Sequence, residues 1–245
     1  MNQDLSEEEF LRRYRSESYE KPSVAVDLLI FTIKNEKLCI YMTKRQAHPF
    51  WGGLCLPGVF VRMDETLEEA AKRCFVEKTG FPDGSEIYFE QLYTWSGIHR
   101  DPRMRIISVS YIALVPLEQL QQLDKVQPEG MKLEEQLFVV EELLEKGVEV
   151  AFDHKDMIEY GKERIKNKAE YSKIAFAFLP ETFTLPQLQK TYEILLDKSL
   201  YKANFRKKVQ DMVEETGEMV LSGAHRPSKL YRAVQGEMTE CRIGK

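Results

Sequence analysis

The sequence predicts an α+β protein in which a domain with a mixed β-sheet precedes a smaller helical domain that closes with a β-hairpin. Three observations lead to this prediction. Strand-like runs surround a single capped helix as far as residue 150, helical periodicity replaces them from about residue 153, and a hairpin pattern follows the last helix. We therefore divide the chain into an N-terminal helix and extension (1–21), a first domain (22–150), a linker helix (151–169), a second domain (170–236) and a tail (237–245).

The composition is that of a folded protein: of 245 residues, 43% are hydrophobic and 31% are charged. The chain has no signal-peptide pattern and no apolar run of about 18 residues, so we expect a cytoplasmic protein without a membrane partner. Its four cysteines are scattered without a CxxC pair, which indicates free thiols. Residues 1–150 carry a net charge of −8 and residues 151–245 a net charge of +3, which suggests different partners for the two parts.

Capping and turn residues mark the first elements. Ser6 and Glu9 form a capping box, which predicts a short N-terminal helix. The run SVAVDLLIFTIKNEKLCIYMTKR that follows predicts two strands joined at Asn35 and Glu36.

The central helix of the first domain is delimited at both ends. Thr66 and Glu69 form a second capping box, and the helix is expected to continue to about Lys78, where Gly80 ends it. The runs EIYFEQLYTW, RIISVSYIALVP and QLFVV predict the remaining strands.

The second domain has a helix-turn-helix pattern. Thr184 can cap a helix that has Pro186 in its first turn, LPQLQKTYEILLD. A short turn leads to a second helix, LYKANFRKKVQDMVEE, whose expected apolar face is formed by Phe205, Val209, Met212 and Val213. The run EMVLSGAHRPSKLYRAV then predicts a hairpin.

The central helix resembles the metal-binding helix of the Nudix motif but lacks most of its carboxylates. Glu65 and Arg73 agree with that motif, whereas its three metal-ligand positions are occupied by Cys74, Glu77 and Lys78. Because Lys78 places a cation where a divalent metal would bind, we expect no metal site, no catalytic residues and little affinity for Mg²⁺.

The retained and replaced residues also have ordinary structural interpretations. Glu77 is either a surface carboxylate, solvated or paired with Arg73 or Lys78, or a residual metal ligand. Cys74 is either a small packing residue or a nucleophile.

A second group of residues is expected to bind a phosphate-containing ligand. Alternating arginines that lead into a strand can present guanidinium groups on one face, and aromatic side chains can stack on an adenine. The alternative is a solvated loop with ordinary aromatic packing. The candidates are Phe50, Glu77, Trp95, Arg100, Arg103 and Arg105.

The second helix of the helix-turn-helix pattern is expected to bind DNA. Its cations lie in its first half, where they oppose the helix dipole, so helix stability does not explain them. Asn204 and Arg206 are candidates for reading base edges. Phosphate contacts are expected from the helix and the hairpin tip, namely Lys202, Lys207, Lys208, His225, Arg226 and Lys229. The alternative is a basic helix in a protein-binding module.

Both halves together resemble the Nudix-related transcriptional regulators of the NrtR type. The resemblance rests on VAVDLLIF, LPGVFV and DPRxRxISVSYxAL, followed by FDHxxI, FTLxxLQxxYExxL, NFRKK, TGE and GxxRPSxLYR, and it covers residues 22–234. It implies a Nudix α/β/α sandwich with a mixed sheet, followed by an α+β winged helix-turn-helix domain.

The resemblance also implies a function. We expect a homodimeric repressor of NAD metabolism genes that binds double-stranded DNA at a palindromic operator, responds to ADP-ribose or a related metabolite, and requires no cofactor. The effector would reorient the domains about the linker helix near residues 153–168. The alternatives are a Nudix hydrolase of ADP-ribose-like nucleoside diphosphate derivatives and a regulator that responds to a pentose or sugar phosphate.

Overall fold

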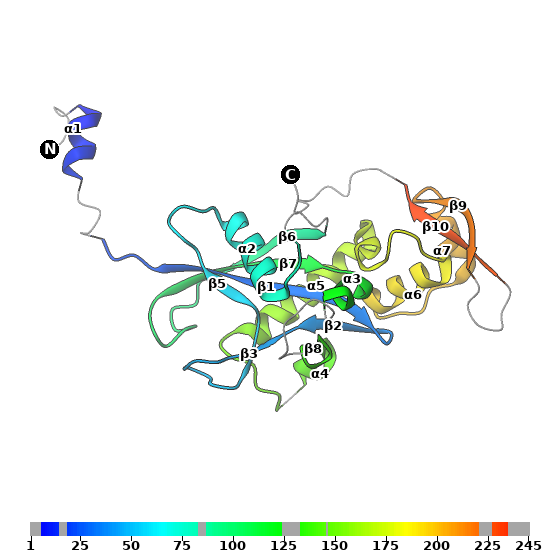
Figure 1. Cartoon of the computed structure of the whole chain (residues 1–245), viewed down its shortest axis with the longest axis horizontal. Coiled ribbons are helices and arrows are strands. Elements are labelled where there is room, and N and C mark those ends of the chain that lie inside the picture. The colour runs from blue at the N-terminus through cyan, green and yellow to red at the C-terminus, as the bar shows by residue number, and fades with distance from the viewer. Residues whose placement is uncertain are drawn as a thin grey trace.

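The computed structural model describes residues 6–14, 19–82, 87–123, 133–145, 147–220 and 227–234. A six-stranded sheet in the order β6-β7-β1-β2-β8, with β5 paired to β1, forms the centre of the first domain (Figure 1). Strand β1 runs parallel to β7 and antiparallel to β2 and β5, so the predicted mixed sheet is confirmed. The strands are β1 (Ser23–Lys34), β2 (Lys37–Tyr41), β5 (Gly58–Phe60), β6 (Tyr88–Trp95), β7 (Ile106–Leu114) and β8 (Leu137–Val139).

The predicted turn between the first two strands is present. Asn35 and Glu36 adopt the left-handed conformation, with φ of 50° and 60°, and they connect β1 to β2. A small separate sheet pairs β3 (Thr43–Lys44) with β4 (Leu54–Cys55) beside the main sheet.

Helices cover both faces of the main sheet because side chains of β1 alternate between the faces. Leu28 and Ile30 pack in one cluster with Ala70 and Phe75 of α2 (Leu67–Thr79). Their neighbours on the opposite face pack in a second cluster with α5 (His154–Tyr171). The first domain is completed by α3 (Leu117–Leu123), η2 (Leu133–Glu135) and α4 (Val140–Leu144).

Both predicted capping boxes of the first part are confirmed. Thr66 accepts a hydrogen bond from the amide of Glu69, and Gly80 ends α2 in the left-handed conformation with φ of 74°. Helix α1 (Glu7–Arg13) begins with the same motif at Ser6, and none of its residues is buried. No helix in the described part of the chain is long and apolar enough to span a membrane.

Helix α5, which the sequence predicts as a linker, is instead part of the core of the first domain. Gly161 lies so close to β1 that an added Cβ would come within 2.6 Å of Leu29 Cδ2. Arg164 and Lys168 bind the carboxylate of Glu90 on β6 at 2.6 and 2.8 Å. A bend within residues 153–168 would break these contacts, so any reorientation of the domains about this helix must move α5 as a rigid unit.

The second domain contains the predicted helix-turn-helix and hairpin. Its helices are η3 (Ile174–Phe178), α6 (Leu185–Leu196) and α7 (Lys202–Val209), followed by β9 (Val213–Val220) and β10 (Ser228–Ala233). Thr184 caps α6 with Pro186 in its first turn, as predicted. One hydrophobic cluster joins the α5 face of the sheet to Leu188, Tyr192 and Phe205 of the second domain, so the two domains share a continuous core.

Helix α7 is shorter than the sequence predicts. It ends at Val209, and residues from Val213 onward form β9 rather than further helical turns. Glu214 and Glu215 therefore do not lie on the helix: they pair across the hairpin with Arg232 and Lys229, respectively. Helical periodicity alone could not detect these cross-strand pairs, which favour the strand.

Candidate functional site

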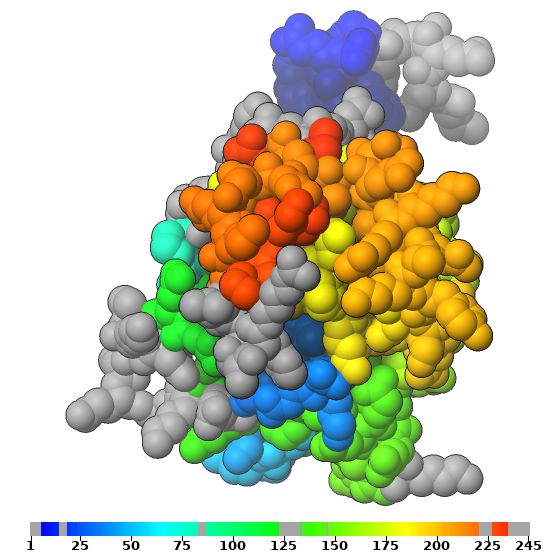
Figure 2. Space-filling view, turned by 90° about the vertical axis from the view of Figure 1, so that its right-hand side faces the viewer, coloured from blue at the N-terminus to red at the C-terminus, as the bar shows by residue number. Residues whose placement is uncertain are grey.

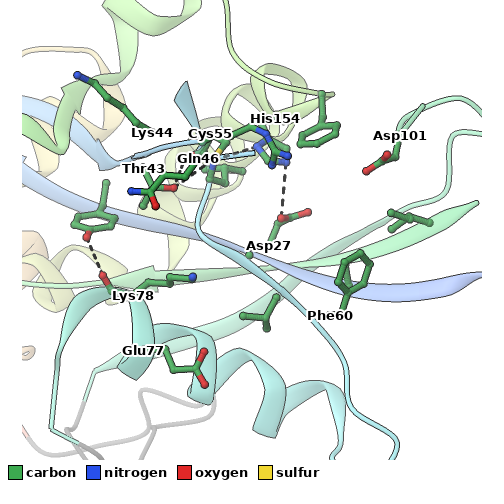
Figure 3. Close-up of a pocket in the computed structure, with 18 of the residues that line it drawn as sticks. Asp27, Thr43, Lys44, Gln46, Cys55, Phe60, Glu77, Lys78, Asp101 and His154 are labelled. Carbon is green, nitrogen blue, oxygen red and sulfur yellow. Dashed lines mark hydrogen bonds and ion pairs between the residues drawn. The ribbon is translucent and has the colours of Figure 1, made fainter. Parts of the chain in front are cut away.

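A cavity of about 500 Å³ opens beside the C-terminal end of α2, which is a suitable size for a nucleotide-like ligand. Its walls come from β1, the β3–β5 region, the loop before β7 and the start of α5 (Figure 3). The charged residues of the lining are Asp27, Lys44, Arg45, Glu77, Lys78, Arg100, Asp101 and Arg103. Basic groups outnumber acidic ones by five to three, so the cavity favours an anion.

A buried ion-pair cluster forms one wall of the cavity. Arg100 donates two hydrogen bonds to Asp153, from Nε to Oδ2 at 2.8 Å and from Nη2 to Oδ1 at 2.7 Å. The same Nη2 lies 3.6 Å from Asp27 Oδ2, and the Arg100 side chain is only 6% exposed. Ser108 donates a hydrogen bond to Asp27, and Gly58 leaves space for this carboxylate, since a Cβ there would lie 2.3 Å from Asp27 Oδ1. Arg100 therefore links the sheet to the first residues before α5.

His154 completes this wall in its neutral form. The amide of Leu56 donates to His154 Nδ1 at 3.0 Å, which assigns the ring proton to Nε2, 3.7 Å from Asp27 Oδ1. Figure 3 shows these two side chains pointing toward each other. Burial lowers the pKa of His154 more strongly than the neighbouring carboxylates raise it.

Phe152 supplies an aromatic wall that the sequence analysis missed. It has a φ of 57°, and its ring lies beneath the guanidinium carbons of Arg45 and Arg103, at 4.7 and 5.7 Å. Phe50 contacts it edge to face with a centroid distance of 5.0 Å. The FDH run was noted in the sequence only as part of the family resemblance. It did not point to the cavity, because residue 152 is far along the chain from the other lining residues.

The six residues expected to bind a phosphate-containing ligand are not brought together. Arg100, Arg103 and Glu77 line the cavity, whereas Phe50 is not part of the lining and only contacts the lining residue Phe152. The remaining two lie outside the lining: Arg105 donates to the carbonyls of Ser96 and Gly97, and Trp95 packs with Tyr93 and Tyr160. The expectation that all three arginines present their guanidinium groups on one face is therefore wrong. Strand β7 begins only at Ile106, so the residues before it do not alternate between two faces as they would in a strand.

Helix α2 holds its Nudix-like residues in ion pairs and packing contacts. Arg73 binds Glu65 at 2.6 Å, and these contacts lower the pKa of Glu65 to about 2. Glu77 lies 3.4 Å from Arg73 and 3.9 Å from Arg62, so the ion-pair interpretation applies to it. Cys74 is completely buried, and burial raises the pKa of its thiol to about 12, so it is a packing residue.

These residues do not fit a divalent metal. Of the three ligand positions on α2, one is a buried thiol and one is the cation Lys78, and the single carboxylate is already paired. No group of three or more His, Cys, Asp or Glu side chains within the described residues is arranged to hold a metal ion.

A second candidate surface lies at the opposite end of the molecule. Figure 2 shows α7 on the right of this end and the β9–β10 hairpin on the upper left, both exposed. Phe205 and Val209 of α7 are buried, whereas Lys202, Asn204, Arg206 and Lys207 are exposed.

The two residues expected to read bases lie on different flanks of α7. Arg206 borders a groove with α6, whereas Asn204 borders a separate groove next to the end of α5. Residues two apart in a helix are separated by about 200° around its axis, so both side chains cannot enter one groove of DNA with the same helix face.

Two of the expected phosphate contacts are engaged within the protein. Lys208 Nζ donates to the carbonyl of Glu170 at 3.3 Å and lies 5.2 Å above the ring of Tyr192. Lys229 lies on β10, not at the hairpin tip, and it binds Glu215 at 2.9 Å. His225 and Arg226 fall outside the described residues.

Comparison with known proteins identifies both domains. The model of the NUDIX domain matches residues 21–160, and that of the NrtR DNA-binding winged helix domain matches residues 175–233. The chain is 34% identical over 235 residues to the ADPR responsive transcriptional repressor NtrR of Acinetobacter baylyi, covering 93% of this chain and 88% of the relative.

Solved structures give the same result. Shewanella oneidensis NrtR in complex with a 27mer DNA superposes with a TM-score of 0.75 at 32% identity, covering 86% of this chain and 93% of that one. The NUDIX domain of that protein in complex with ADP ribose has a TM-score of 0.52 at 28% identity, covering 65% of this chain and 99% of that one. The chain therefore belongs to the NrtR family of Nudix-related transcriptional regulators.

Proposed function

We propose that this protein is a transcriptional repressor that binds DNA through α7 and the β9–β10 hairpin and changes its affinity for DNA when ADP-ribose enters the cavity. The observation that carries the proposal is the anion-favouring cavity in a NUDIX domain whose core is continuous with an NrtR DNA-binding winged helix. The relatives described above respond to ADP-ribose and bind DNA, which supports both parts.

The chemistry of the cavity suits ADP-ribose. The ligand combines an adenine with a diphosphate, and the cavity combines the ring of Phe152 with the cations Arg45 and Arg103 above it. Guanidinium groups can bind phosphate oxygens with two hydrogen bonds, which favours a diphosphate over an uncharged sugar. Asp101 binds Arg103 at 2.7 Å and so fixes one of these guanidinium groups in position.

Helix α5 is the proposed route from the cavity to DNA. At its start, Asp153 is bound by Arg100, and at its end the carbonyl of Glu170 is bound by Lys208 of α7. Its 18 residues span about 27 Å. Because α5 is packed along the sheet, it acts as a rigid lever: an effector that displaces Arg100 or Phe152 moves the support of α7. The effect cannot exceed the preference of ADP-ribose for one arrangement over the other.

The assembly and the targets follow from the same proposal. A homodimer would place two winged helices about one DNA turn apart, which requires a palindromic operator. We propose NAD metabolism genes as the targets and a cytoplasmic location for the protein.

The test is fluorescence anisotropy of the protein on duplex DNA from its own upstream region, titrated with ADP-ribose at fixed salt while release of AMP is assayed. Specific binding that ADP-ribose alters, without AMP, is the expected result. Rapid Mg²⁺-dependent AMP release without specific DNA binding would instead identify a hydrolase, whereas binding indifferent to ADP-ribose would direct the search to sugar phosphates.

A variant separates the cavity from the DNA-binding surface. Arg103→Ala removes a guanidinium group that lines the cavity and is 41% exposed. The backbone amide at this position still donates to the buried Asp101 carboxylate, and a melting curve checks that the variant is folded. We expect DNA binding to remain and the response to ADP-ribose to weaken. An unchanged response would remove Arg103 from the site.

A further inference from the structure

The proposed ligand contains a diphosphate, but the α2 residues that line the cavity do not provide the metal site that would neutralise it. A diphosphate carries concentrated negative charge, which Nudix hydrolases neutralise with divalent cations held by the helix that corresponds to α2. In this chain that helix does not provide a metal site, since Cys74 is buried and Glu77 is paired with arginines. If ADP-ribose binds here, as the proposed function requires, a protein cation on the α2 side of the cavity must meet the diphosphate together with Arg45 and Arg103.

Lys78 is in a position to be that group. It lies in the last turn of α2, and the hydroxyl of Tyr41 donates to its backbone carbonyl at 2.8 Å, which anchors this turn against β2. Its side chain lines the cavity, and none of the ion pairs within the described part of the chain involves it. In Figure 3 the Lys78 side chain extends between α2 and the strand that bears Asp27, whereas Glu77 points away from that strand.

We propose that the ammonium group of Lys78 binds the diphosphate of ADP-ribose in place of a divalent cation, so that effector binding is independent of metal. An ammonium group is a compact charge with three donors, and it can contact oxygens of both phosphates. Unlike a metal ion, it cannot lower the pKa of a coordinated water to produce a nucleophile. The same substitution therefore retains binding and removes hydrolysis.

The proposal predicts opposite roles for Mg²⁺ in the wild type and in a charge-reversed variant. Mg²⁺ should not tighten binding to the wild type, because Lys78 repels a second cation at the same place. In Lys78→Glu the carboxylate repels the diphosphate, but it restores a metal ligand beside Glu77.

The experiment is isothermal titration calorimetry of the full chain with ADP-ribose, in EDTA and again in Mg²⁺. The wild type should bind with the same Kd in both buffers. Lys78→Met should weaken binding by about ten- to hundredfold in both, the effect of losing a hydrogen bond to a charged group. Lys78→Glu should lose measurable binding in EDTA and recover part of it in Mg²⁺.

The matched control is Lys72→Met on the same helix. Lys72 pairs with Glu68 at 2.8 Å and does not line the cavity. The Lys72→Met variant should therefore bind ADP-ribose with the same Kd as the wild type. Lys78 is exposed and Lys72 is partly buried, so all variants should stay folded, with at most a small loss for Lys78→Glu at the C-terminal end of α2. Melting temperatures check this and exclude misfolding as the cause.

The outcomes distinguish this inference from the proposed function on which it rests. A wild type that binds ADP-ribose only with Mg²⁺, or a Lys78→Met variant that binds as the wild type does, would overturn the role of Lys78 and leave the effector intact. A wild type that binds ADP-ribose in neither buffer would overturn the effector itself.

Discussion

The loop before β7 and helix α7 both carry closely spaced cations, but the fold uses them in opposite ways. Arg100 is directed inward, where Asp27 and Asp153 surround it, whereas Lys202 and Lys207 are exposed to solvent. The loop must cross the end of the sheet next to the start of α5, so Arg100 meets carboxylates there. Helix α7 buries only its apolar positions and leaves most of its charges outside.

This difference shows that a cluster of cations in a sequence indicates a positive charge, but not whether the cations form ion pairs within the protein or remain free to bind a ligand. In the cavity, one arginine is structural and a neighbouring arginine is available to a ligand. On α7, three exposed cations are available to DNA, and Lys208 is held against the end of α5. Mutations can test each side of this comparison.

The largest effect is expected from Arg100→Ala. It leaves the buried Asp27 and the partly buried Asp153 without their cation, which should lower the free energy of unfolding by about 3–5 kcal/mol. Urea unfolding measures this loss. The control is Arg105→Ala, which removes only exposed hydrogen bonds to two carbonyls and should cost less than about 1 kcal/mol. Equal losses in the two variants would mean that the ion pairs of Arg100 stabilise the fold no more than the exposed hydrogen bonds of Arg105 do.

Gly161→Val tests whether α5 connects the two regions rigidly. The added side chain meets Leu29 and Phe31 and should lower the free energy of unfolding by about 1–3 kcal/mol. Asn167→Val on the exposed face of the same helix should cost less than about 0.5 kcal/mol, because asparagine and valine have similar helix propensities. If Gly161→Val were no worse than Asn167→Val, α5 would be loosely attached and the lever proposal would fail.

Lys207→Ala and Lys208→Ala test which α7 cations face DNA. The Lys207 variant should lower affinity uniformly across DNA sequences and reduce the salt slope of log K by about 0.9, as expected for one lost phosphate contact. The Lys208 variant should have a smaller effect, because its ammonium group already binds the Glu170 carbonyl. Anisotropy titrations at several salt concentrations measure both, and the reverse order would show that Lys208 leaves α5 to reach DNA.

The smallest effect concerns pH and the buried wall of the cavity. Burial lowers the pKa of His154, so below about pH 6.5 the unfolded chain takes up a proton there that the folded protein resists. Stability should therefore fall as pH decreases from 7.5 to 5.5, by at most about 1.4 kcal/mol per pH unit from this group. His154→Gln should reduce the slope of unfolding free energy against pH. An identical slope in the variant would mean that the wall is accessible to water and that the ring can be protonated in place.

Local sequence patterns predicted most of the secondary structure. The capping boxes at Ser6 and Thr66, the helix cap at Thr184 and the turn at Asn35 depend on residues within a few positions of each other, so they could be recognised directly. The prediction was wrong at the end of α7, where pairing with a strand about 15 residues later, from Lys229 to Arg232, determined the conformation of Glu214 and Glu215.

The candidate site was predicted less completely. The sequence indicated the replaced ligand positions on α2 and the cations of α7, because composition and spacing are local properties. Its expectation that these cations lie in the first half of the helix, against the helix dipole, was wrong: α7 ends at Val209, so Arg206, Lys207 and Lys208 lie in its last turn. It did not indicate that Asp27, Phe152 and His154 line the same cavity as Arg100. These residues are separated by many positions along the chain, and only the packing of α5 against the sheet brings them together.

The sequence by itself determined the order of the domains, the limits of most helices and the loss of the metal ligands, since each follows from neighbouring residues. Only the tertiary structure decided which arginines are buried, that α5 is part of the core, and that Lys208 is held against the end of α5. The physical reason is that the direction of a side chain depends on what packs against its element, and that partner lies elsewhere in the chain.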